Sequence, residues 1–184
     1  MATALISQFG FAMDGNLKKT SQAYQLIVSV EDQQMTLLEN GKQVRSYKVS
    51  TAKNGVGEAF DSDLTPRGRH EIAEKVGEGA PVGMVFVALI PTGEIVKVNE
   101  PGRWPIVTRI FRLRGLEEKN KNSFDRMIYL HGSPVERLLG SPASGGCIRM
   151  RSGEIVELFD LIDVGTPIDI VEGPLPVVFA GSQY

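Results

Sequence analysis

Residues 24–50 read YQLIVSVEDQQMTLLENGKQVRSYKVS, and this stretch decides the fold class. Apolar and β-branched residues dominate the runs Tyr24–Val30, Met35–Leu38 and Gln43–Ser50, and they alternate in part with polar residues. Such runs predict half-buried β-strands. The Asn40-Gly41 pair is the strongest tight-hairpin signal in the chain, because both residues tolerate the positive φ angles that such turns need. The first third of the chain is therefore predicted to be a β-meander.

The rest of the chain continues as short strands separated by loops rich in glycine and proline. Thr65–Gly68 and Pro91–Gly93 have turn chemistry, and Pro101–Pro105 interrupts the chain again. The strands expected in this part are Arg69–Ala73, Met84–Ile90, Ile106–Leu113, Arg126–Leu130 and Ile168–Val171.

One stretch late in the chain has a helical period. The residues that recur at positions i, i+3, i+4 and i+7 are Ile155, Leu158, Phe159 and Ile162. Ser152 is the expected N-cap of this helix, and Gly165 is its expected C-terminal stop. With strands elsewhere, the fold class is predicted to be mainly β, a sandwich or barrel with one principal α-helix.

Length and composition are those of one ordinary globular domain. The chain has 184 residues, of which 42% are apolar and 23% are charged, and its net charge is −2. This charge excludes a general binder of nucleic acids, which needs a strongly basic surface. Residues 22–173 are expected to form the domain, with residues 1–21 as an N-terminal arm and residues 174–184 as a C-terminal tail.

No membrane-spanning segment is expected. The longest apolar run, around Val82–Ile90, is far shorter than the ~20 residues that a span needs. Residues Met1–Met13 have no Lys or Arg before their apolar stretch and no small-residue cleavage site after it, so they do not resemble a secretory signal. The expected location is the cytoplasm, and the alternative is the periplasm if a signal precedes Met1.

The chemistry of the chain centres on its one cysteine, Cys147, and its two histidines, His70 and His131. A lone cysteine is either a small buried hydrophobe or a nucleophile, and a nucleophilic thiol needs a base, because free thiols titrate near ~8.5. His131 ends an apolar strand that would aim its ring. His70 is expected to be a packed strand residue, with a second base as the alternative. This set, without close spacing, predicts neither a metal site nor a cofactor.

The residues around the cysteine suit acyl transfer. Gly145 and Gly146 let the backbone turn with exposed N–H groups, and the N–H groups of Gly146 and Cys147 could stabilise an oxyanion. Arg149 is near enough in sequence to hold a substrate carboxylate. Arg109 lies on a predicted strand, where it belongs either to a solvated face or to a cationic rim for an acidic substrate.

Two segments together, His131-Gly132 and Ser144-Gly145-Gly146-Cys147-Ile148-Arg149-Met150, resemble the signature of the L,D-transpeptidase family, whose catalytic domain is called YkuD-like. Thr65–Gly68 is similar to the family's Thr-Pro-x-Gly turn, and Gly165–Ile170 is similar to its closing segment. The resemblance covers roughly Tyr24 to Val171. It implies a sandwich or barrel of mixed sheets whose principal helix follows the catalytic cysteine.

The resemblance also implies roles for single residues. Cys147 would be the nucleophile and His131 its general base. The backbone carbonyl of Gly132 would orient His131, and the N–H groups of Gly146 and Cys147 would form the oxyanion hole.

Four further residues are expected at the substrate: Ser144, Gly145, Arg149 and Arg109. Arg149 would either brace the loop or meet a carboxylate. Gly145 departs from the family signature, which has a histidine two residues before the cysteine. The departure removes an imidazole that could shape the loop or touch substrate, but it leaves the nucleophile and its base in place.

The substrate class that the family implies is the peptidoglycan stem peptide. The thiolate attacks the carbonyl of the third residue, a diamino acid, and the terminal D-Ala leaves a thioester behind. An amine acceptor then gives transpeptidation, and water gives L,D-carboxypeptidase activity. With a cytoplasmic location the expected partner is a stem tetrapeptide or soluble muropeptide, and the expected activity is hydrolysis during recycling. The alternatives are a cross-linking or exchanging L,D-transpeptidase, a cysteine hydrolase of another acyl substrate, and a non-catalytic muropeptide-binding module.

Overall fold

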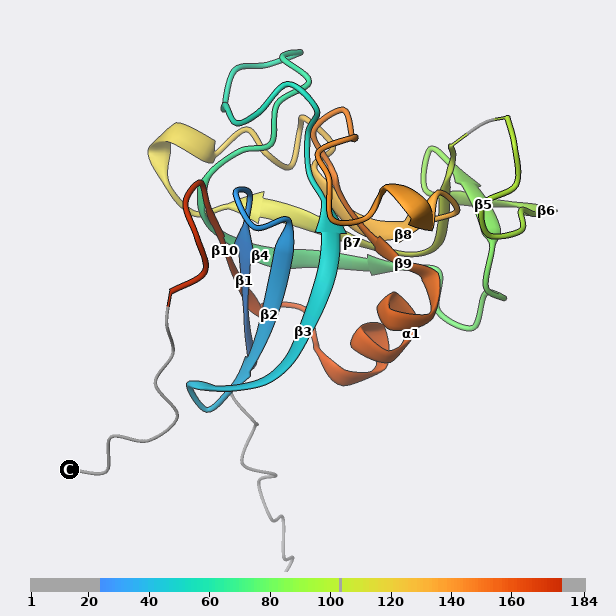
Figure 1. Ribbon diagram of the computed structural model, residues 1–184, viewed down its shortest axis with the longest axis horizontal. Helices are drawn as coiled ribbons and strands as arrows, with labels where there is room; N and C mark the ends of the chain where they lie inside the picture. Colours follow the sequence, from blue (N-terminus) through green and yellow to red (C-terminus); the bar gives the residue numbers. More distant parts are fainter. Residues whose placement is uncertain (1–23, 103, 177–184) are drawn as a thin grey trace, which may run out of the picture.

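The computed structural model describes residues 24–102 and 104–176, drawn as ribbon in Figure 1. The strands are β1 (Tyr24–Ser29), β2 (Gln34–Glu39), β3 (Lys42–Ser50), β4 (Gly68–Val76), β5 (Met84–Val87), β6 (Ile90–Ile95), β7 (Ile106–Gly115), β8 (Tyr129–Ser133), β9 (Ile148–Arg151) and β10 (Pro167–Val171). The helices are α1 (Ser152–Leu161) and the short 3-10 helices η1 (Glu118–Asn120) and η2 (Glu136–Leu138).

The strands form one 10-stranded mixed sheet in the order β4-β10-β1-β2-β3-β9-β8-β7-β5-β6. An additional pairing of β4 with β7 closes the sheet into a barrel, and the β5–β6 hairpin extends from β7 outside this ring. The pairs β1–β10 and β8–β9 are parallel, and the others are antiparallel. The mainly β fold class, with a mixed sheet and one principal helix, is confirmed.

The predicted meander is present as β1, β2 and β3. Asn40 and Gly41 join β2 to β3 with φ angles of 51° and 76°, both positive, as a tight hairpin requires. The strand that begins after the Thr65–Gly68 turn is also present, as β4.

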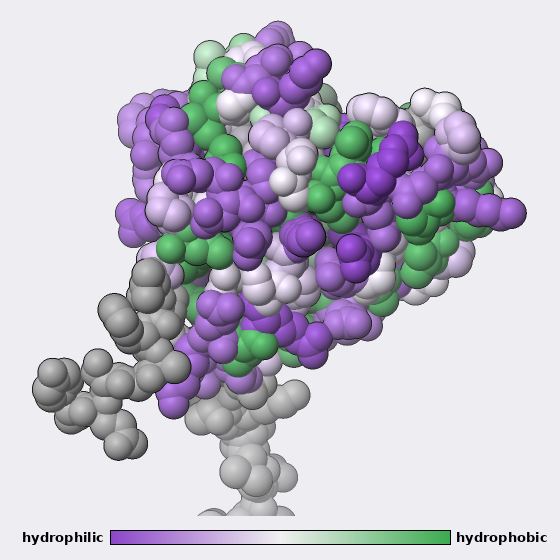
Figure 2. Space-filling view, in the orientation of Figure 1, coloured by the Kyte–Doolittle hydropathy of each residue, from purple (hydrophilic) through white to green (hydrophobic). Residues whose placement is uncertain are grey.

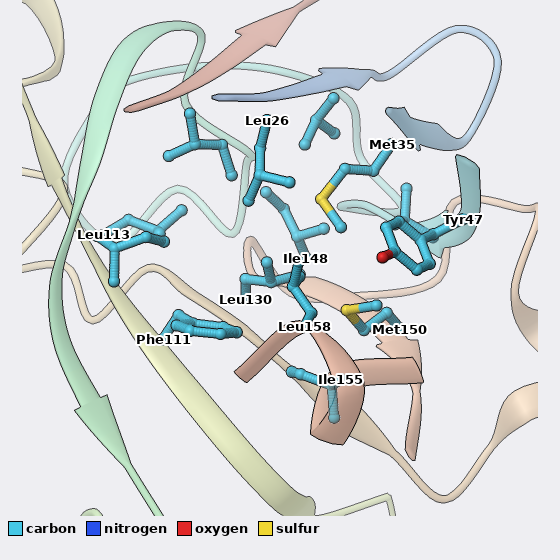
Figure 3. Packing of buried hydrophobic residues seen from close by; sticks show 14 of the residues in the cluster. Leu26, Met35, Tyr47, Phe111, Leu113, Leu130, Ile148, Met150, Ile155 and Leu158 are labelled. Atoms are coloured by element: carbon cyan, nitrogen blue, oxygen red, sulfur yellow. The ribbon is translucent and has the colours of Figure 1, made fainter. Parts of the chain in front are cut away.

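The barrel interior is filled by aliphatic and aromatic side chains from the strands and from α1 (Figure 3). Leu130 of β8 and Ile148 of β9 are fully buried there, next to Ile155 and Leu158 of α1. Because side chains alternate along a strand, the neighbours of Leu130 and Ile148 point to the outer face of the barrel. That outer face carries the residues of chemical interest.

The ends of the predicted helix differ from expectation. Ser152 is the first residue of α1 and not its N-cap. Its backbone N–H donates to Glu136 Oε1 at 3.0 Å, so a carboxylate from outside the helix accepts a hydrogen bond from the first turn. The helix ends at Leu161, before Gly165. Ile162 leaves the helix to enter the core, and the Gly165 N–H donates to the Ile72 carbonyl at 2.8 Å, which ties the chain to the barrel wall.

Two predicted strands were placed wrongly. Met84–Ile90 is not one buried strand, because Ala88 and Leu89 turn the chain with φ angles of 49° and 67°, and the expected turn Pro91–Gly93 lies inside β6. The outer half of the apolar run faces solvent, with Ile90 67% exposed. The green surface at the right of Figure 2 lies over this hairpin.

The strand expected from Arg126 begins only at Tyr129, because Met127 has a φ of 56° and interrupts an extended chain. Within the described ranges, no helix has the length and hydropathy to cross a bilayer. The predicted arm, residues 1–21, and most of the predicted tail lie outside the described residues, so the domain limits stay a prediction.

Candidate active site

Strands β7, β8 and β9 bring the predicted site residues together on the outer face of the barrel. The parallel register pairs His131 of β8 with Arg149 of β9, and Cys147 lies one residue before β9 begins. Ile110 of β7 pairs with His131 from the other side. The loop between η2 and β9 therefore delivers the cysteine beside the strand that carries the histidine.

Cys147 opens into a cavity of about 410 Å³. One wall is apolar and includes Phe86 of β5 and Ile110, which pack against the cysteine together with Tyr129. The facing wall is polar and includes residues 61–63 and Arg126, and Gly145 forms part of the rim at the cysteine loop. An apolar wall with a few convergent polar groups is typical of a ligand-binding pocket.

His131 is held as a neutral imidazole. The ring is 4% exposed, and its Nδ1 lies 2.8 Å from the Gly132 carbonyl oxygen. A carbonyl only accepts, so Nδ1 carries the proton and Nε2 has the free lone pair. Burial lowers the pKa of His131, the hydrogen bond to the Gly132 carbonyl opposes this, and the charge of Arg149 adds to the lowering, so that the pKa is about 4. At neutral pH the imidazole is therefore uncharged and able to take a proton.

Cys147 is a protonated thiol in the resting protein. The side chain is partly buried, and its Sγ donates to the Met127 carbonyl at 3.4 Å. Burial raises the pKa of the thiol, while a backbone hydrogen bond from Tyr129 and the charges of Arg149 and Arg126 oppose that rise. The thiol consequently needs a base to react at neutral pH.

The loop before the cysteine is fixed by two hydroxyl groups. Ser144 is 5% exposed; its Oγ donates to the Cys147 carbonyl and accepts from the Gly146 N–H at 3.2 Å. Thr65 is fully buried; its Oγ1 accepts from the Ala52 N–H at 2.9 Å and donates to the Gly146 carbonyl at 2.9 Å. Sequence reasoning treated Thr65 only as a turn residue and missed this brace.

These contacts modify the expected oxyanion hole. The Gly146 N–H is engaged by Ser144 Oγ, whereas the Cys147 N–H has no acceptor among the described residues. Ser144 itself lies under the loop and is not part of the cavity wall, so the structure gives it a bracing position instead of the expected place at the substrate. Gly145 does line the cavity, as expected.

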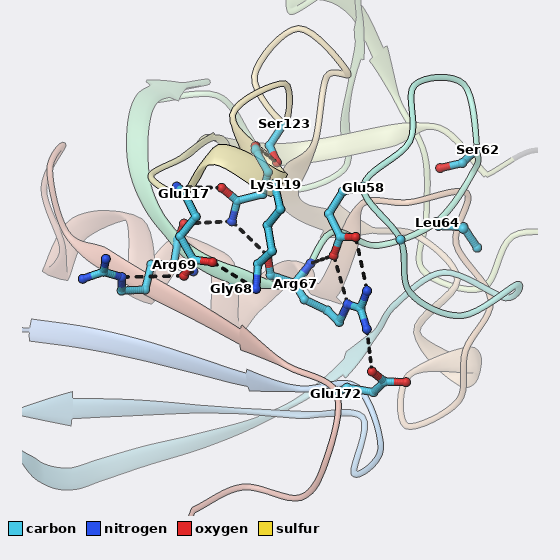
Figure 4. A network of polar contacts seen from close by, with 12 residues as sticks. Glu58, Ser62, Leu64, Arg67, Gly68, Arg69, Glu117, Lys119, Ser123 and Glu172 are labelled. Atoms are coloured by element: carbon cyan, nitrogen blue, oxygen red, sulfur yellow. Dashed lines mark hydrogen bonds and ion pairs between the residues drawn. The ribbon is translucent and has the colours of Figure 1, made fainter.

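The loop that carries Thr65 is anchored by a charged network, drawn in Figure 4. Arg67 forms ion pairs with Glu58 at 2.9 Å and with Glu172 at 2.8 Å. The hydrogen bonds from Arg67 hold the pKa of the Glu58 carboxyl below its usual range. Nearby, Glu117 accepts from the Arg69 N–H at 2.9 Å. The network ties the polar wall of the cavity to the barrel.

The two arginines expected at the substrate lie elsewhere. Arg149 donates to the Ala143 carbonyl at 3.1 Å and lies over the Trp104 ring at 5.8 Å, so it braces the loop. Arg109 is 6% exposed, donates to the Ala80 carbonyl at 2.6 Å and lies over the Phe159 ring of α1. Neither residue lines the cavity. For Arg109 the reason is that its side chain points away from the face that Ile110 shares with the cysteine.

His70 is a packed strand residue. It is 1% exposed, with Nδ1 2.9 Å from the Gly68 carbonyl oxygen and Nε2 3.0 Å from Ser123 Oγ. Burial lowers the pKa of this ring as well. His70 does not line the cavity, which leaves the second-base alternative without support. Over residues 24–102 and 104–176, no group of three potential metal ligands is found.

Comparison with known proteins agrees with this arrangement. Residues 23–170 match the family model of the L,D-transpeptidase catalytic domain, YkuD. The Bacillus subtilis protein YqjB, whose name assigns it to the L,D-transpeptidases, is 27% identical over 147 residues, which are 80% of this chain and 70% of that protein. The Escherichia coli protein ErfK/SrfK, with a name of the same kind, is 38% identical over 50 residues, 27% of this chain and 16% of its own length.

Solved structures share the fold at low identity. L,D-transpeptidase 3 from Mycobacterium tuberculosis has a TM-score of 0.54 at 17% identity, covering 82% of this chain and 62% of its own. An L,D-transpeptidase from Mycobacterium smegmatis has a TM-score of 0.52 at 16% identity, covering 82% of this chain and 59% of its own. The chain thus spans roughly three fifths of these solved chains.

Proposed function

Because the chain belongs to the L,D-transpeptidase catalytic domain family, we propose that it is a cysteine enzyme that removes the terminal D-Ala from peptidoglycan stem tetrapeptides, with water as the acyl acceptor. The observation that carries this proposal is a protonated Cys147 that opens into the cavity one residue before β9, next to β8, which carries the neutral His131.

The proposed first half-reaction forms a thioester. His131 Nε2 takes the proton from Cys147 Sγ as the sulfur attacks the carbonyl carbon of the third residue, a diamino acid. The Cys147 N–H stabilises the oxyanion that develops. The C–N bond then breaks, and the proton on His131 passes to the amine of the departing D-Ala. The acyl group remains on sulfur.

In the second half-reaction an acceptor attacks the thioester. His131 takes a proton from water, the C–O bond forms, the C–S bond breaks, and the proton returns to the sulfur. Gly145 supports water as the acceptor. A Cβ at this position would lie 3.6 Å from Asp63 Oδ1, an ordinary contact, so glycine leaves the space of a side chain at the cavity rim to solvent.

The cytoplasm is the compartment that belongs to this proposal, because a hydrolase of soluble muropeptides works there and a reducing environment keeps a lone thiol active. Immunoblots of fractionated cells test it. Detection in the periplasm would favour the cross-linking or exchanging L,D-transpeptidase instead.

Mass spectrometry of the protein with a stem tetrapeptide ending in D-Ala tests the reaction, with and without added glycine or a D-amino acid. Loss of D-Ala in water alone, abolished by Cys147→Ala, is the expected result. Exchange of D-Ala for the added amino acid would make the protein a transpeptidase. No change in either mixture, with a thiol inert to iodoacetamide, would make it a muropeptide-binding module, and turnover of another acyl substrate alone would make it a different cysteine hydrolase.

A further inference from the structure

Arg126 is the cationic residue that lines the cavity in the described part of the chain. It precedes Met127, whose carbonyl accepts the Cys147 thiol, so the guanidinium and the sulfur are held by the same short turn. Their charges interact: Arg126 lowers the pKa of the Cys147 thiol, and a thiolate there would raise the pKa of Arg126. Nothing in the sequence motif marks this residue.

The guanidinium is fixed, but it is not neutralised. Its Nη1 donates to the Gly57 carbonyl at 3.1 Å, and its Nη2 donates to Ser62 Oγ at 3.1 Å and to the Leu64 carbonyl at 2.7 Å. All three acceptors are uncharged oxygens, and among the described residues Arg126 forms no ion pair. A guanidinium has five N–H donors, so two remain for a ligand.

Arg126 is a partly buried cation that the charge of Glu58 influences without forming an ion pair, which makes it a candidate site for an anion. Burial lowers the pKa of Arg126, which reflects the loss of solvation that an incoming anion would offset. Asp61 and Asp63 line the same cavity and are exposed, and neither pairs with the guanidinium. A ligand that brings its own carboxylate to Arg126 therefore meets an immobilised cation that still has one N–H on Nε and one on Nη1 to donate.

We infer that Arg126 binds the free carboxylate of the D-amino acid that leaves the substrate. This inference rests on the proposed function. In a peptide the terminal carboxylate lies one residue, ~3.8 Å between Cα atoms, beyond the carbonyl that the thiol attacks. Arg126 and Cys147 line the same cavity, and Arg126 directly precedes the residue whose carbonyl accepts the thiol, so a peptide attacked by the sulfur can bring this carboxylate toward the guanidinium. Arg149 and Arg109, the arginines that the sequence favours, lie outside the cavity.

The test compares two substrates, the tetrapeptide ending in D-Ala and the same peptide ending in D-alaninamide. The wild-type protein is expected to prefer the free acid by at least tenfold in kcat/KM. Arg126→Gln removes the preference by slowing cleavage of the acid more than cleavage of the amide, and Arg126→Lys, which keeps the charge, retains part of it. Arg45→Gln is the matched control, because Arg45 pairs with Glu157 on the exposed surface, and it should retain the full preference.

The ratio of the two substrates is the readout, because Arg126 also holds the loop of Gly57 and Leu64 and its loss can slow both reactions alike. A wild-type protein that cleaves acid and amide equally, or an Arg126→Gln protein that keeps the preference, would overturn the inference and leave the proposed function standing.

Calorimetry separates failure of the inference from failure of the proposed function. In the Cys147→Ala background, the acid peptide should bind at least tenfold more tightly than the amide, and Arg126→Gln should abolish the difference. If the wild-type protein cleaves neither peptide but this binding preference appears, the hydrolase proposal fails and the carboxylate site stands. If both peptides bind equally, the carboxylate site fails.

Discussion

Gly132 couples the packing of the barrel to the aim of the proposed base. A Cβ atom at this position would lie 2.6 Å from the Val107 carbonyl oxygen, which is shorter than a van der Waals contact between these two atoms. The register of β7 against β8 shifts between Val107 and Ile110, and Thr108 in this irregular stretch has a φ of 74°. The Gly132 carbonyl also accepts from His131, so the backbone that fits against the bulge orients the imidazole.

Gly132→Ala is therefore expected to reduce the free energy of unfolding by about 1–3 kcal/mol, because β7 and β8 must separate to admit the methyl group. It should also lower kcat more than it changes KM. Denaturant unfolding and steady-state kinetics measure the two effects. Gly153→Ala is the control: a Cβ there meets nothing within 4 Å inside α1, and the change should raise stability by about 0.4–1 kcal/mol. Equal effects of the two substitutions would contradict this account.

The buried His131 makes both activity and stability depend on pH. Its pKa is about 4 in the folded protein and ~6.5 in an unfolded chain, so the unfolded state binds more protons between these values. Stability is complete above pH ~6.5 and falls as the pH drops toward 4, by up to about 3 kcal/mol from this residue. The acid limb of kcat/KM should lie near pH 4.

Urea unfolding at pH 7 and pH 4.5 measures the stability part. His131→Gln should lose less stability between these two pH values than the wild-type protein does. His70 adds a loss of the same sign in both proteins, so the difference between them isolates His131. An identical pH dependence in both would contradict the assignment.

At the scale of elements, the cysteine loop depends on a loop far away in sequence. Thr65 follows the loop 53–64 and connects the Ala52 N–H to the Gly146 carbonyl. This hydroxyl holds the peptide unit that precedes Cys147, and with it the direction of the Cys147 N–H. The Thr-Pro turn thus contributes to the site through its threonine as well as through its backbone shape.

Thr65→Val keeps the shape of the side chain and removes both hydrogen bonds. It is expected to reduce the free energy of unfolding by about 1–3 kcal/mol, because the buried Ala52 N–H loses its acceptor. It should also slow alkylation of Cys147 by iodoacetamide in step with kcat, since the loop loses its fixed position. Thr65→Ser, which keeps the hydroxyl, should stay close to the wild-type protein in both assays. A normal alkylation rate in Thr65→Val would show that the brace does not position the loop.

Elements with strong local signals were predictable from the sequence, and those set by distant contacts were not. The meander follows from alternation and from Asn40-Gly41, and the positions of Cys147 and His131 follow from their short motifs. The turn at Ala88-Leu89 contains no typical turn residue, so the apolar run around it gave no signal that the strand ends there. The position of Arg126 at the cavity could not be predicted from the sequence, because it depends on how residues 57–64 fold over the guanidinium.

At the scale of the whole molecule, the barrel is completed by its last strand. β10 lies between β1 and β4, so Ile168 pairs with Leu26 near the start of the described chain and with His70 in the middle. The side chain is fully buried in the main core. Closure of the ring therefore requires contacts between residues more than 100 positions apart, and partial folding offers little of the native burial.

Ile168→Ala is expected to reduce the free energy of unfolding by about 2–5 kcal/mol. Loss of structure by circular dichroism and exposure of Cys147 to iodoacetamide should occur at the same denaturant concentration, because one closed barrel carries both. Val164→Ala is the control, since Val164 is 59% exposed and should change stability by less than about 0.5 kcal/mol. Two separate transitions in Ile168→Ala would mean that the site and the barrel unfold independently.

The β5–β6 hairpin gives the molecule a modular design. Its backbone pairs with the ring through β5 and β7, Phe86 packs against Ile110 and Tyr129, and Phe86, Ala88 and Leu89 form one wall of the cavity. Ala88 and Leu89 adopt positive φ angles, which asparagine or glycine would adopt with less strain. The backbone at these two residues is therefore strained. Exchanging residues 84–95 for another hairpin would therefore reshape the pocket and keep the β4–β7 pairing that closes the ring, while Tyr129 of β8 and Cys147 would pack against new side chains.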